Sequence, residues 1–251
     1  MKIGFTSTTL RPIKDLAQIA QIAKQAGADC IEWGGDIHVT NLQSALLAKT
    51  ACQNAGIEIL SYGTYYRVGC GDLAKWISIC EIAKAMEARV IRVWLGTRGS
   101  KKTTAFGYKR ILQDLADICA VANRYGLLVA PECHPNTFND NTMAFLQIHK
   151  DLKQLGHADN FRTYFQSLYK NLAYDFNRIE RTAGEIEIVH ISYSERIREQ
   201  LFCRKNKNYI AMLLKKLKET GYDNTVLLEY TCFSKPDCLI KDLERLKKDL
   251  Q

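Results

Sequence analysis

Short apolar runs alternate with longer amphipathic segments along the whole chain. An apolar run rich in β-branched residues predicts a buried strand, whereas apolar residues three and four apart predict a helix. In most units a helix-like segment ends near glycine or another turn signal, and a short apolar run follows. The pattern predicts eight strands, at residues 2–7, 30–33, 57–62, 90–94, 127–130, 161–166, 186–192 and 225–228.

Amphipathic helices are predicted between these strands at residues 13–25, 72–86, 108–124, 143–155 and 207–220, and after the last strand at residues 236–250. Residues 171–184 are polar and only weakly periodic, and they are assigned as a helix by their place between two strands. The predicted strands start roughly 25 to 40 residues apart, which is the length that one strand-plus-helix unit requires. Eight such units in 251 residues match the size of a (β/α)₈ barrel. A doubly wound sheet is the main alternative. It typically has a glycine-rich loop after its first strand, and residues 5–9 contain no glycine.

The composition is that of a globular protein with one core. No linker, low-complexity segment or charge block divides the chain, so we expect residues 1–251 to form a single TIM-barrel domain. No apolar run approaches the ~20 residues that span a bilayer, and the N-terminus lacks the apolar region of a signal peptide. The nine cysteines include no Cys-x-x-Cys pair, which favours buried reduced thiols in a cytoplasmic protein.

The formal net charge of +8 comes from 35 basic and 27 acidic residues. A positive field attracts phosphorylated metabolites and nucleic acid. Part of the excess falls on a predicted helix face at residues 215–218. Basic residues also follow predicted strands, at Arg98, Lys101 and Arg196, where they fit either a solvated loop or a phosphate-binding loop. Charge alone therefore leaves the partner open.

Side chains that can carry chemistry gather where the predicted strands end. The fifth strand runs into Pro131-Glu-Cys-His-Pro-Asn136, the seventh ends in His190 and the eighth in Glu229. Residues two apart in a strand point to the same side, so His134 accompanies Glu132. In a barrel the C-terminal strand ends form the active site. We therefore expect Glu132, His190 and Glu229 to face one another across the barrel mouth.

The chain resembles the sugar phosphate isomerase/epimerase superfamily, the xylose isomerase-like barrels that also include endonuclease IV. The matching segments are Gly27-Ala-Asp-Cys-Ile-Glu-Trp-Gly-Gly-Asp36, Pro131-Glu-Cys-His-Pro-Asn136, Val189-His190 and Leu228-Glu-Tyr230. The resemblance spans the chain from its first strand to its last. It implies an enzyme that isomerises or epimerises a small sugar, sugar acid or sugar phosphate.

The resemblance also implies a metal site. The family typically binds one divalent ion through Glu, Asp, His and Glu on strands five to eight. By position three ligands correspond to Glu132, His190 and Glu229, and the ion would be Mn²⁺, Mg²⁺ or Zn²⁺. Strand six departs from the pattern, because Gln166 stands where Asp is expected. An amide oxygen can bind such ions but is neutral, so we expect a weaker site for hard cations.

The family chemistry explains the need for two carboxylates. Moving a carbonyl, or inverting the carbon beside it, requires removal of a weakly acidic C–H proton. One carboxylate takes that proton, charge gathers on the enediolate oxygen, and a carboxyl group returns a proton. The resemblance therefore implies Glu132 and Glu229 as the catalytic acid and base, with either residue in either role.

Other residues near the strand ends are candidate substrate contacts. Trp33 could stack on a sugar ring, and His38 could donate to a hydroxyl. Arg92 points from a strand, and its burial would demand an anionic partner such as Glu132, Glu32 or the substrate. The full set of predicted substrate contacts is Glu32, Trp33, His38, Tyr65, Arg92, His134 and Arg196.

Two alternatives accompany this prediction. An endonuclease IV-like phosphodiesterase would suit the positive charge, but it requires a multi-zinc cluster. The chain has five histidines, and His149 and His157 fall on or after a predicted helix, so nucleic acid is an unfavoured partner. A sugar-binding relative without turnover is the other alternative, supported by Gln166. Dehydration or decarboxylation through the same enediolate is a related activity, and homo-oligomerisation stays open.

Overall fold

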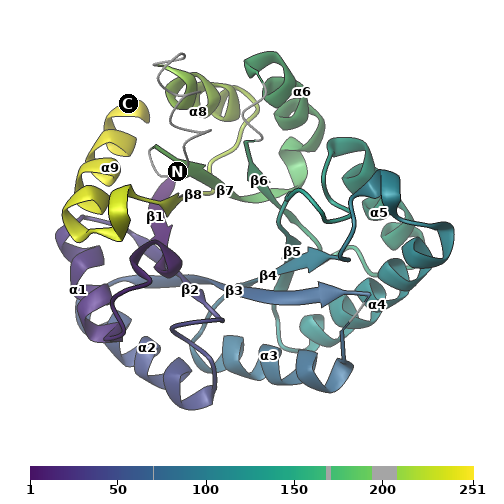
Figure 1. The fold of residues 1–251 in the computed structure, drawn as a ribbon, viewed down its shortest axis with the longest axis horizontal. Coiled ribbons are helices and arrows are strands. Elements are labelled where there is room, and N and C mark those ends of the chain that lie inside the picture. The colour runs from purple at the N-terminus through teal and green to yellow at the C-terminus, as the bar shows by residue number, and fades with distance from the viewer. Residues whose placement is uncertain (70, 168–170, 194–207) are drawn as a thin grey trace.

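The computed structural model of the chain describes residues 1–69, 71–167, 171–193 and 208–251. Eight parallel strands surround a central axis, and helices form a ring outside them (Figure 1). The two termini lie close together on one side of the ring (Figure 1). This arrangement confirms the predicted single-domain (β/α)₈ barrel and excludes the doubly wound sheet.

The strands follow one another around the barrel in chain order, and each hydrogen-bonded pair is parallel. They are β1 (Lys2–Thr6), β2 (Cys30–Gly34), β3 (Glu58–Val68), β4 (Val90–Leu95), β5 (Leu128–Pro131), β6 (Thr163–Gln166), β7 (Ile186–Ser192) and β8 (Thr225–Tyr230). Strands β5 and β6 stand at the two ends of the continuous strand order. Two isolated bridges, Val129 to Phe161 and Glu132 to Tyr164, connect them and close the barrel.

Helices occupy most of the connections. They are α1 (Leu16–Gln25), α2 (Leu42–Ala55), α3 (Leu73–Ala85), α4 (Ala105–Arg124), α5 (Thr142–Gln154), α6 (Leu172–Thr182), α8 (Tyr209–Glu219) and α9 (Pro236–Asp249). Short 3₁₀ segments lie at Ser7–Leu10, Ser100–Lys102, Ala183–Glu185 and Cys232–Ser234. The side chains of Asp15, Asn41 and Asn171 accept backbone N–H groups at the starts of α1, α2 and α6, which explains where these helices begin. No helix in the described ranges is long and apolar enough to cross a membrane.

Strand β3 is longer than predicted. The apolar run suggested an end at Tyr62, but the strand continues to Val68. The pairing with β4 resumes there, at Arg67 opposite Trp94, after an irregularity in the register. Tyr65 and Arg67 therefore belong to the strand itself, beyond its predicted end at Tyr62.

An apolar layer fills the inside of the barrel, formed by Cys30, Leu60, Val90, Ala130, Tyr164, Ile188 and Leu227. A larger apolar core separates the strands from the helices. Side chains alternate across a strand, so the next inward position lies two residues further on. On most strands that position is polar and buried or partly buried: Glu32, Arg92, Glu132, Gln166, His190 and Glu229. The strand periodicity thus places a polar layer directly on an apolar floor, toward the C-terminal strand ends.

Candidate active site and metal-ligand cluster

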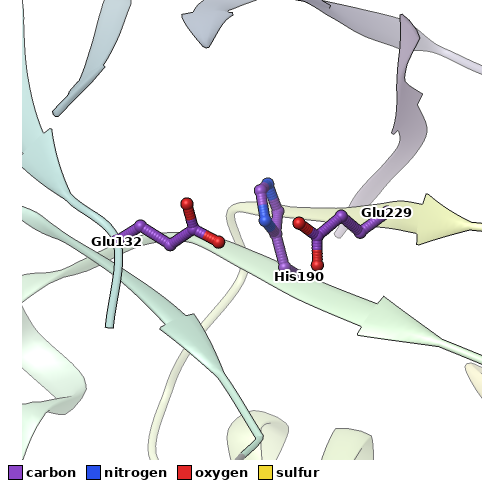
Figure 2. Close-up of side chains that lie close together, drawn as sticks. All are labelled: Glu132, His190 and Glu229. Atoms are coloured by element: carbon purple, nitrogen blue, oxygen red, sulfur yellow. The ribbon is translucent and has the colours of Figure 1, made fainter. Parts of the chain in front are cut away.

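Three buried side chains converge within the polar layer. Figure 2 shows Glu132 pointing from the end of β5 toward His190 of β7 and Glu229 of β8. One potential ligand atom from each residue lies within 4.8 Å of the others. The structure therefore brings together the three residues that the resemblance implied as metal ligands. It brings Gln166 there too, because the Gln166 side-chain amide donates to Glu229 Oε2 at 2.8 Å.

Several polar atoms of this cluster are buried and accept or donate no hydrogen bond within the described part of the chain. They are Glu132 Oε2, Gln166 Oε1 and both ring nitrogens of His190. Buried polar atoms are nearly always hydrogen-bonded, so such a set has capacity for one further group. Carboxylate and amide oxygens with an imidazole nitrogen are ordinary donors to Mn²⁺, Mg²⁺ and Zn²⁺. The residues present fit a divalent ion.

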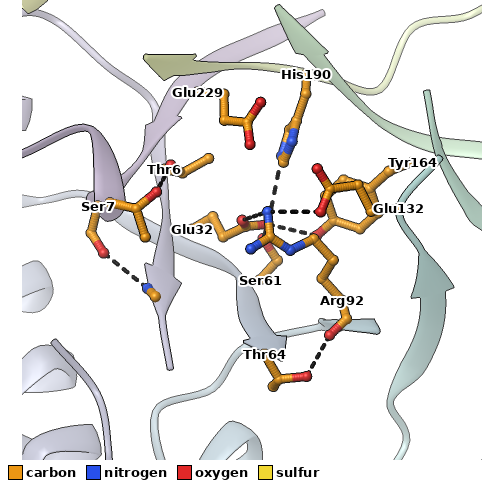
Figure 3. Close-up of polar contacts among 12 residues, drawn as sticks. Thr6, Ser7, Glu32, Ser61, Thr64, Arg92, Glu132, Tyr164, His190 and Glu229 are labelled. Carbon is orange, nitrogen blue, oxygen red and sulfur yellow. Dashed lines mark hydrogen bonds and ion pairs between the residues drawn. The ribbon is translucent and has the colours of Figure 1, made fainter. Parts of the chain in front are cut away.

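A buried ion-pair network adjoins these ligands (Figure 3). Arg92 Nη1 lies 3.1 Å from Glu32 Oε1 and 3.5 Å from Glu132 Oε2. Both side chains of the closer pair are almost fully buried, with Glu32 1% and Arg92 3% exposed. A Cβ on Gly63 would lie 2.8 Å from Glu32 Oε1 and 3.1 Å from Arg92 Nη2, so glycine leaves space for the pair. Arg92 thus has the anionic partners that its burial demanded, and they are Glu32 and Glu132 together.

Glu32 connects this network to the histidine. Its Oε2 accepts hydrogen bonds from Ser61 Oγ at 2.8 Å and from the Tyr164 hydroxyl at 2.7 Å. The same oxygen lies 3.8 Å from His190 Nε2. Ser61 and Tyr164 were not predicted as site residues. Tyr164 could have been found, because it precedes Gln166 by two positions and therefore shares its inward side.

The anionic charge of the cluster does not depend on strand six alone. A histidine binds a metal ion through its neutral ring. In formal charges, the carboxylates of Glu32, Glu132 and Glu229, the guanidinium of Arg92 and a neutral His190 then sum to −2. A divalent cation balances that charge. The sequence predicted a site one charge short because Gln166 replaces Asp. The structure adds the carboxylate of Glu32 next to His190, but Arg92 offsets its charge.

The network has marked effects on ionisation. Burial opposes the charged form of Glu32, but Arg92, His190 and the Tyr164 hydroxyl outweigh it and lower the pKa of Glu32 to about 2. Burial likewise lowers the pKa of His190, but Glu32 and Glu229 outweigh it, so that pKa is raised. Burial also disfavours charged Arg92, yet Glu32 and Glu132 raise its pKa. Glu32 and Arg92 therefore stay ionised at neutral pH.

We expect the ionisation of Glu32 to appear in the pH dependence of stability. The pKa of Glu32 falls from an ordinary value of 4.5 to about 2 on folding, so its contribution is present above pH 4.5 and is lost toward pH 2. The difference corresponds to about 3 kcal/mol. Urea unfolding between pH 6 and pH 2.5 should show less pH dependence for Glu32→Gln than for the wild type. The control Glu81→Gln changes an exposed residue and should behave as the wild type. If the free energy of unfolding changes equally with pH in all three proteins, the expectation is wrong.

An aromatic group lies at the next inward position of β4. Trp94 stacks on His134 with ring centroids 4.5 Å apart and contacts Tyr65 at 5.6 Å. The Arg67 guanidinium lies 3.9 Å from the centre of the Trp94 ring. Two predicted substrate contacts, Tyr65 and His134, therefore meet around a tryptophan that was not singled out. Its position two residues after Arg92 could have indicated it.

Two other predicted contacts lie elsewhere. Trp33 is fully buried in the core between strands and helices, because it stands one residue after inward-facing Glu32. His38 is buried, and its ring nitrogens are within hydrogen-bond distance of Ser7 Oγ at 2.8 Å and the Ile13 carbonyl at 3.0 Å. The structure therefore buries both side chains among protein groups and does not bring them into the cluster of Glu132, His190 and Glu229. Arg196 lies outside the described residues.

Comparisons with known proteins agree with this architecture. The family model of the xylose isomerase-like TIM barrel matches residues 20–249. A search of curated proteins finds no significant match.

Solved structures share the fold over nearly the full length. A probable 3-DHS dehydratase, AsbF of Bacillus anthracis, has a TM-score of 0.79 at 18% identity and covers 98% of this chain and 99% of its own. A D-allulose 3-epimerase of Methylomonas sp. has a TM-score of 0.77 at 13% identity, covering 100% and 98%. An IolI protein with a bound zinc atom has a TM-score of 0.70 at 16% identity, covering 99% and 96%. The family match extends from α1 to the end of α9, and the chain belongs to the xylose isomerase-like TIM barrel family.

Proposed function

We propose that the protein isomerises or epimerises a small sugar, sugar acid or sugar phosphate by transferring a proton through an enediolate. The observation that carries this proposal is the convergence of two buried carboxylates, Glu132 and Glu229, on one point beside His190. Membership of the family supports it. One solved structure of the same fold is a D-allulose 3-epimerase, an enzyme of this reaction class.

The two carboxylates share the removal and the return of the substrate proton. Glu132 and Glu229 come from β5 and β8, which are separated by β6 and β7 around the barrel wall. A sugar bound between them presents opposite faces to the two groups. One carboxylate removes the proton from the carbon beside the carbonyl. Return by the other group inverts that carbon. Return by the first group to the neighbouring carbon, together with transfer of the hydroxyl proton between the two enediolate oxygens, moves the carbonyl.

The remaining residues of the layer prepare the site for this step. Glu132, Gln166, His190 and Glu229 would hold a divalent ion, which supplies stabilisation of the negative charge that develops on a substrate oxygen. Arg92, 3.5 Å from Glu132 Oε2, restrains the orientation of that carboxylate. The apolar layer below excludes water from underneath and sets the depth to which a substrate can enter.

The rim residues suit the apolar face of a sugar. Trp94, His134 and Tyr65 form an aromatic wall above the polar layer. Aromatic rings bury large apolar surfaces with defined geometry, and the C–H face of a sugar offers a matching surface. We infer that the substrate lies between this wall and the carboxylates, with its carbonyl end toward Glu132 and Glu229.

Solvent-deuterium exchange over a panel of aldoses, ketoses, sugar acids and their phosphates tests the proposal. We expect incorporation of deuterium at a carbon next to the carbonyl of at least one compound. Treatment with a chelator should lower the exchange rate by about 10²-fold, and added Mn²⁺ or Mg²⁺ should restore it. Absence of exchange across the panel, with metal supplied, would argue strongly against this function. Sugar binding without exchange would instead identify a binding protein.

Phosphodiester hydrolysis of the endonuclease IV type is less well supported. Among the described residues, one group of three His, Cys, Asp or Glu side chains has the spacing of a metal site. A multi-zinc cluster needs more ligands than this group contains. Elemental analysis that finds several zinc ions per chain would favour the phosphodiesterase over the isomerase.

A further inference from the structure

The barrel closes between β5 and β6, where two of the proposed metal ligands leave the sheet. Glu132 directly follows β5, and Gln166 ends β6. Both strands contain four residues, and β5 ends in Pro131, which has no backbone N–H to donate. A side chain supplements the pairing here, since the Thr163 hydroxyl donates to the Pro131 carbonyl at 3.2 Å. The relative position of the two strand ends therefore depends in part on side chains.

Arg178 of α6 binds across this junction. Its Nη1 donates to the Gln166 carbonyl at 2.9 Å, and its Nη2 donates to Cys133 Sγ at 3.0 Å. The guanidinium also lies 4.7 Å from the centre of the Phe165 ring. Arg178 is 5% exposed. One planar group thus contacts the backbone that carries Gln166 and the residue next to Glu132.

The guanidinium is itself held in place from the helix side. Asp175, three residues earlier in α6 and fully buried, accepts from Arg178 Nη1 at 2.8 Å. The second carboxylate oxygen of Asp175 accepts from the hydroxyls of Ser167, which directly follows β6, and of Tyr209, which begins α8. Guanidinium N–H groups donate in fixed directions within one plane, so these contacts determine where Arg178 points.

We propose that Arg178 is a positioning residue that sets the distance between the strand ends carrying Glu132 and Gln166. It acts through Cys133 on one side and through the Gln166 carbonyl on the other. The effect extends to Glu229, because the Gln166 amide donates to Glu229 Oε2 at 2.8 Å. The inference rests on the proposed function for the nature of the bound ion, whereas the contacts themselves are independent of it.

The Cys133 thiol offers a selective test. Cys133→Ala removes the contact to β5 and leaves the Arg178 bonds to Asp175 and to the Gln166 carbonyl intact. Removing a contact that orients a metal ligand typically weakens metal binding by 10–100-fold. In the full-length protein, isothermal titration with Mn²⁺ should therefore show about tenfold weaker binding for Cys133→Ala. Cys133→Ser keeps an acceptor at this position and should recover most of the affinity.

Substitutions in α6 complete the comparison. Arg178→Lys keeps the charge beside Asp175, but one ammonium group cannot donate in the directions of a guanidinium fork. It should weaken Mn²⁺ binding at least as much as Cys133→Ala. The matched control Arg181→Gln alters an exposed arginine of the same helix and should bind as the wild type does. Wild-type affinity in folded Cys133→Ala and Arg178→Lys would overturn the proposal.

A second readout does not depend on the ion. Amide hydrogen exchange in peptides covering residues 128–132 and 163–166 should be faster in Cys133→Ala and Arg178→Lys, while peptides covering β2 and β3 are unchanged. If wild-type protein binds no Mn²⁺ and exchanges no sugar proton, the proposed function fails. Amide hydrogen exchange would still test the positioning role. Unchanged amide exchange at β5 and β6 in the two variants would refute that role, and locally faster amide exchange would support it.

Discussion

Replacing Glu132 with glutamine is expected to lower the rate of solvent-deuterium exchange into the substrate by about 10³-fold. The amide has nearly the same size as the carboxyl group, so the barrel should still fold. The amide cannot accept the substrate proton. The substitution also removes one anionic metal ligand from the group formed with His190 and Glu229. The ratio of kcat for the wild type and Glu132→Gln, measured by NMR in deuterated buffer, tests this expectation.

Glu229→Gln and a control separate the roles of the two carboxylates. If one glutamate removes the proton and the other returns it, one variant should lose exchange and conversion together, while the other exchanges the proton without forming product. Glu187→Gln is a matched control, because Glu187 is buried at the opposite end of β7, where it pairs with Arg89. It should retain most of the activity. A Glu132→Gln protein that keeps more than about a tenth of the wild-type rate would exclude Glu132 as acid or base.

Replacing Arg92 with methionine is expected to destabilise the fold by about 3–5 kcal/mol, which lowers Tm by about 10 °C in a domain of this size. Methionine fills similar volume but leaves Glu32 buried without the cation 3.1 Å away. The cost is the uncompensated charge, and the Ser61 and Tyr164 hydroxyls offset only part of it. Calorimetry and urea unfolding at pH 7 measure the loss.

The matched controls for this prediction use the same residue types. Arg89→Met removes a half-exposed cation from its ion pair with the buried Glu187 and should cost less than Arg92→Met, about 1–2 kcal/mol, because solvent already reaches that pair from the Arg89 side. Adding Glu32→Gln to Arg92→Met should restore part of the stability, because the unpaired carboxylate is gone. Equal losses of stability in Arg92→Met and Arg89→Met would show that the buried network contributes no more than a partly exposed ion pair.

The sequence determined the architecture and the location of the site. Apolar runs and turn signals at a regular spacing require strand-plus-helix units, and eight of them close into one barrel. Glu132, His190 and Glu229 could be placed together because the C-terminal strand ends of a barrel meet at one mouth. The demand of buried Arg92 for an anion also followed from the sequence alone, since a buried guanidinium without a partner is costly.

The tertiary structure decided which side chains enter the mouth and how their charges combine. Trp33 and Glu32 are adjacent in the chain, yet one faces the helices and the other the barrel interior, because the side of each strand residue depends on the register. Three contacts join residues that are far apart in the chain. Glu32 lies beside His190, the Arg178 guanidinium donates to Cys133, and Trp94 stacks on His134. Such contacts depend on distances across the closed barrel, which local patterns of apolar and polar residues do not encode.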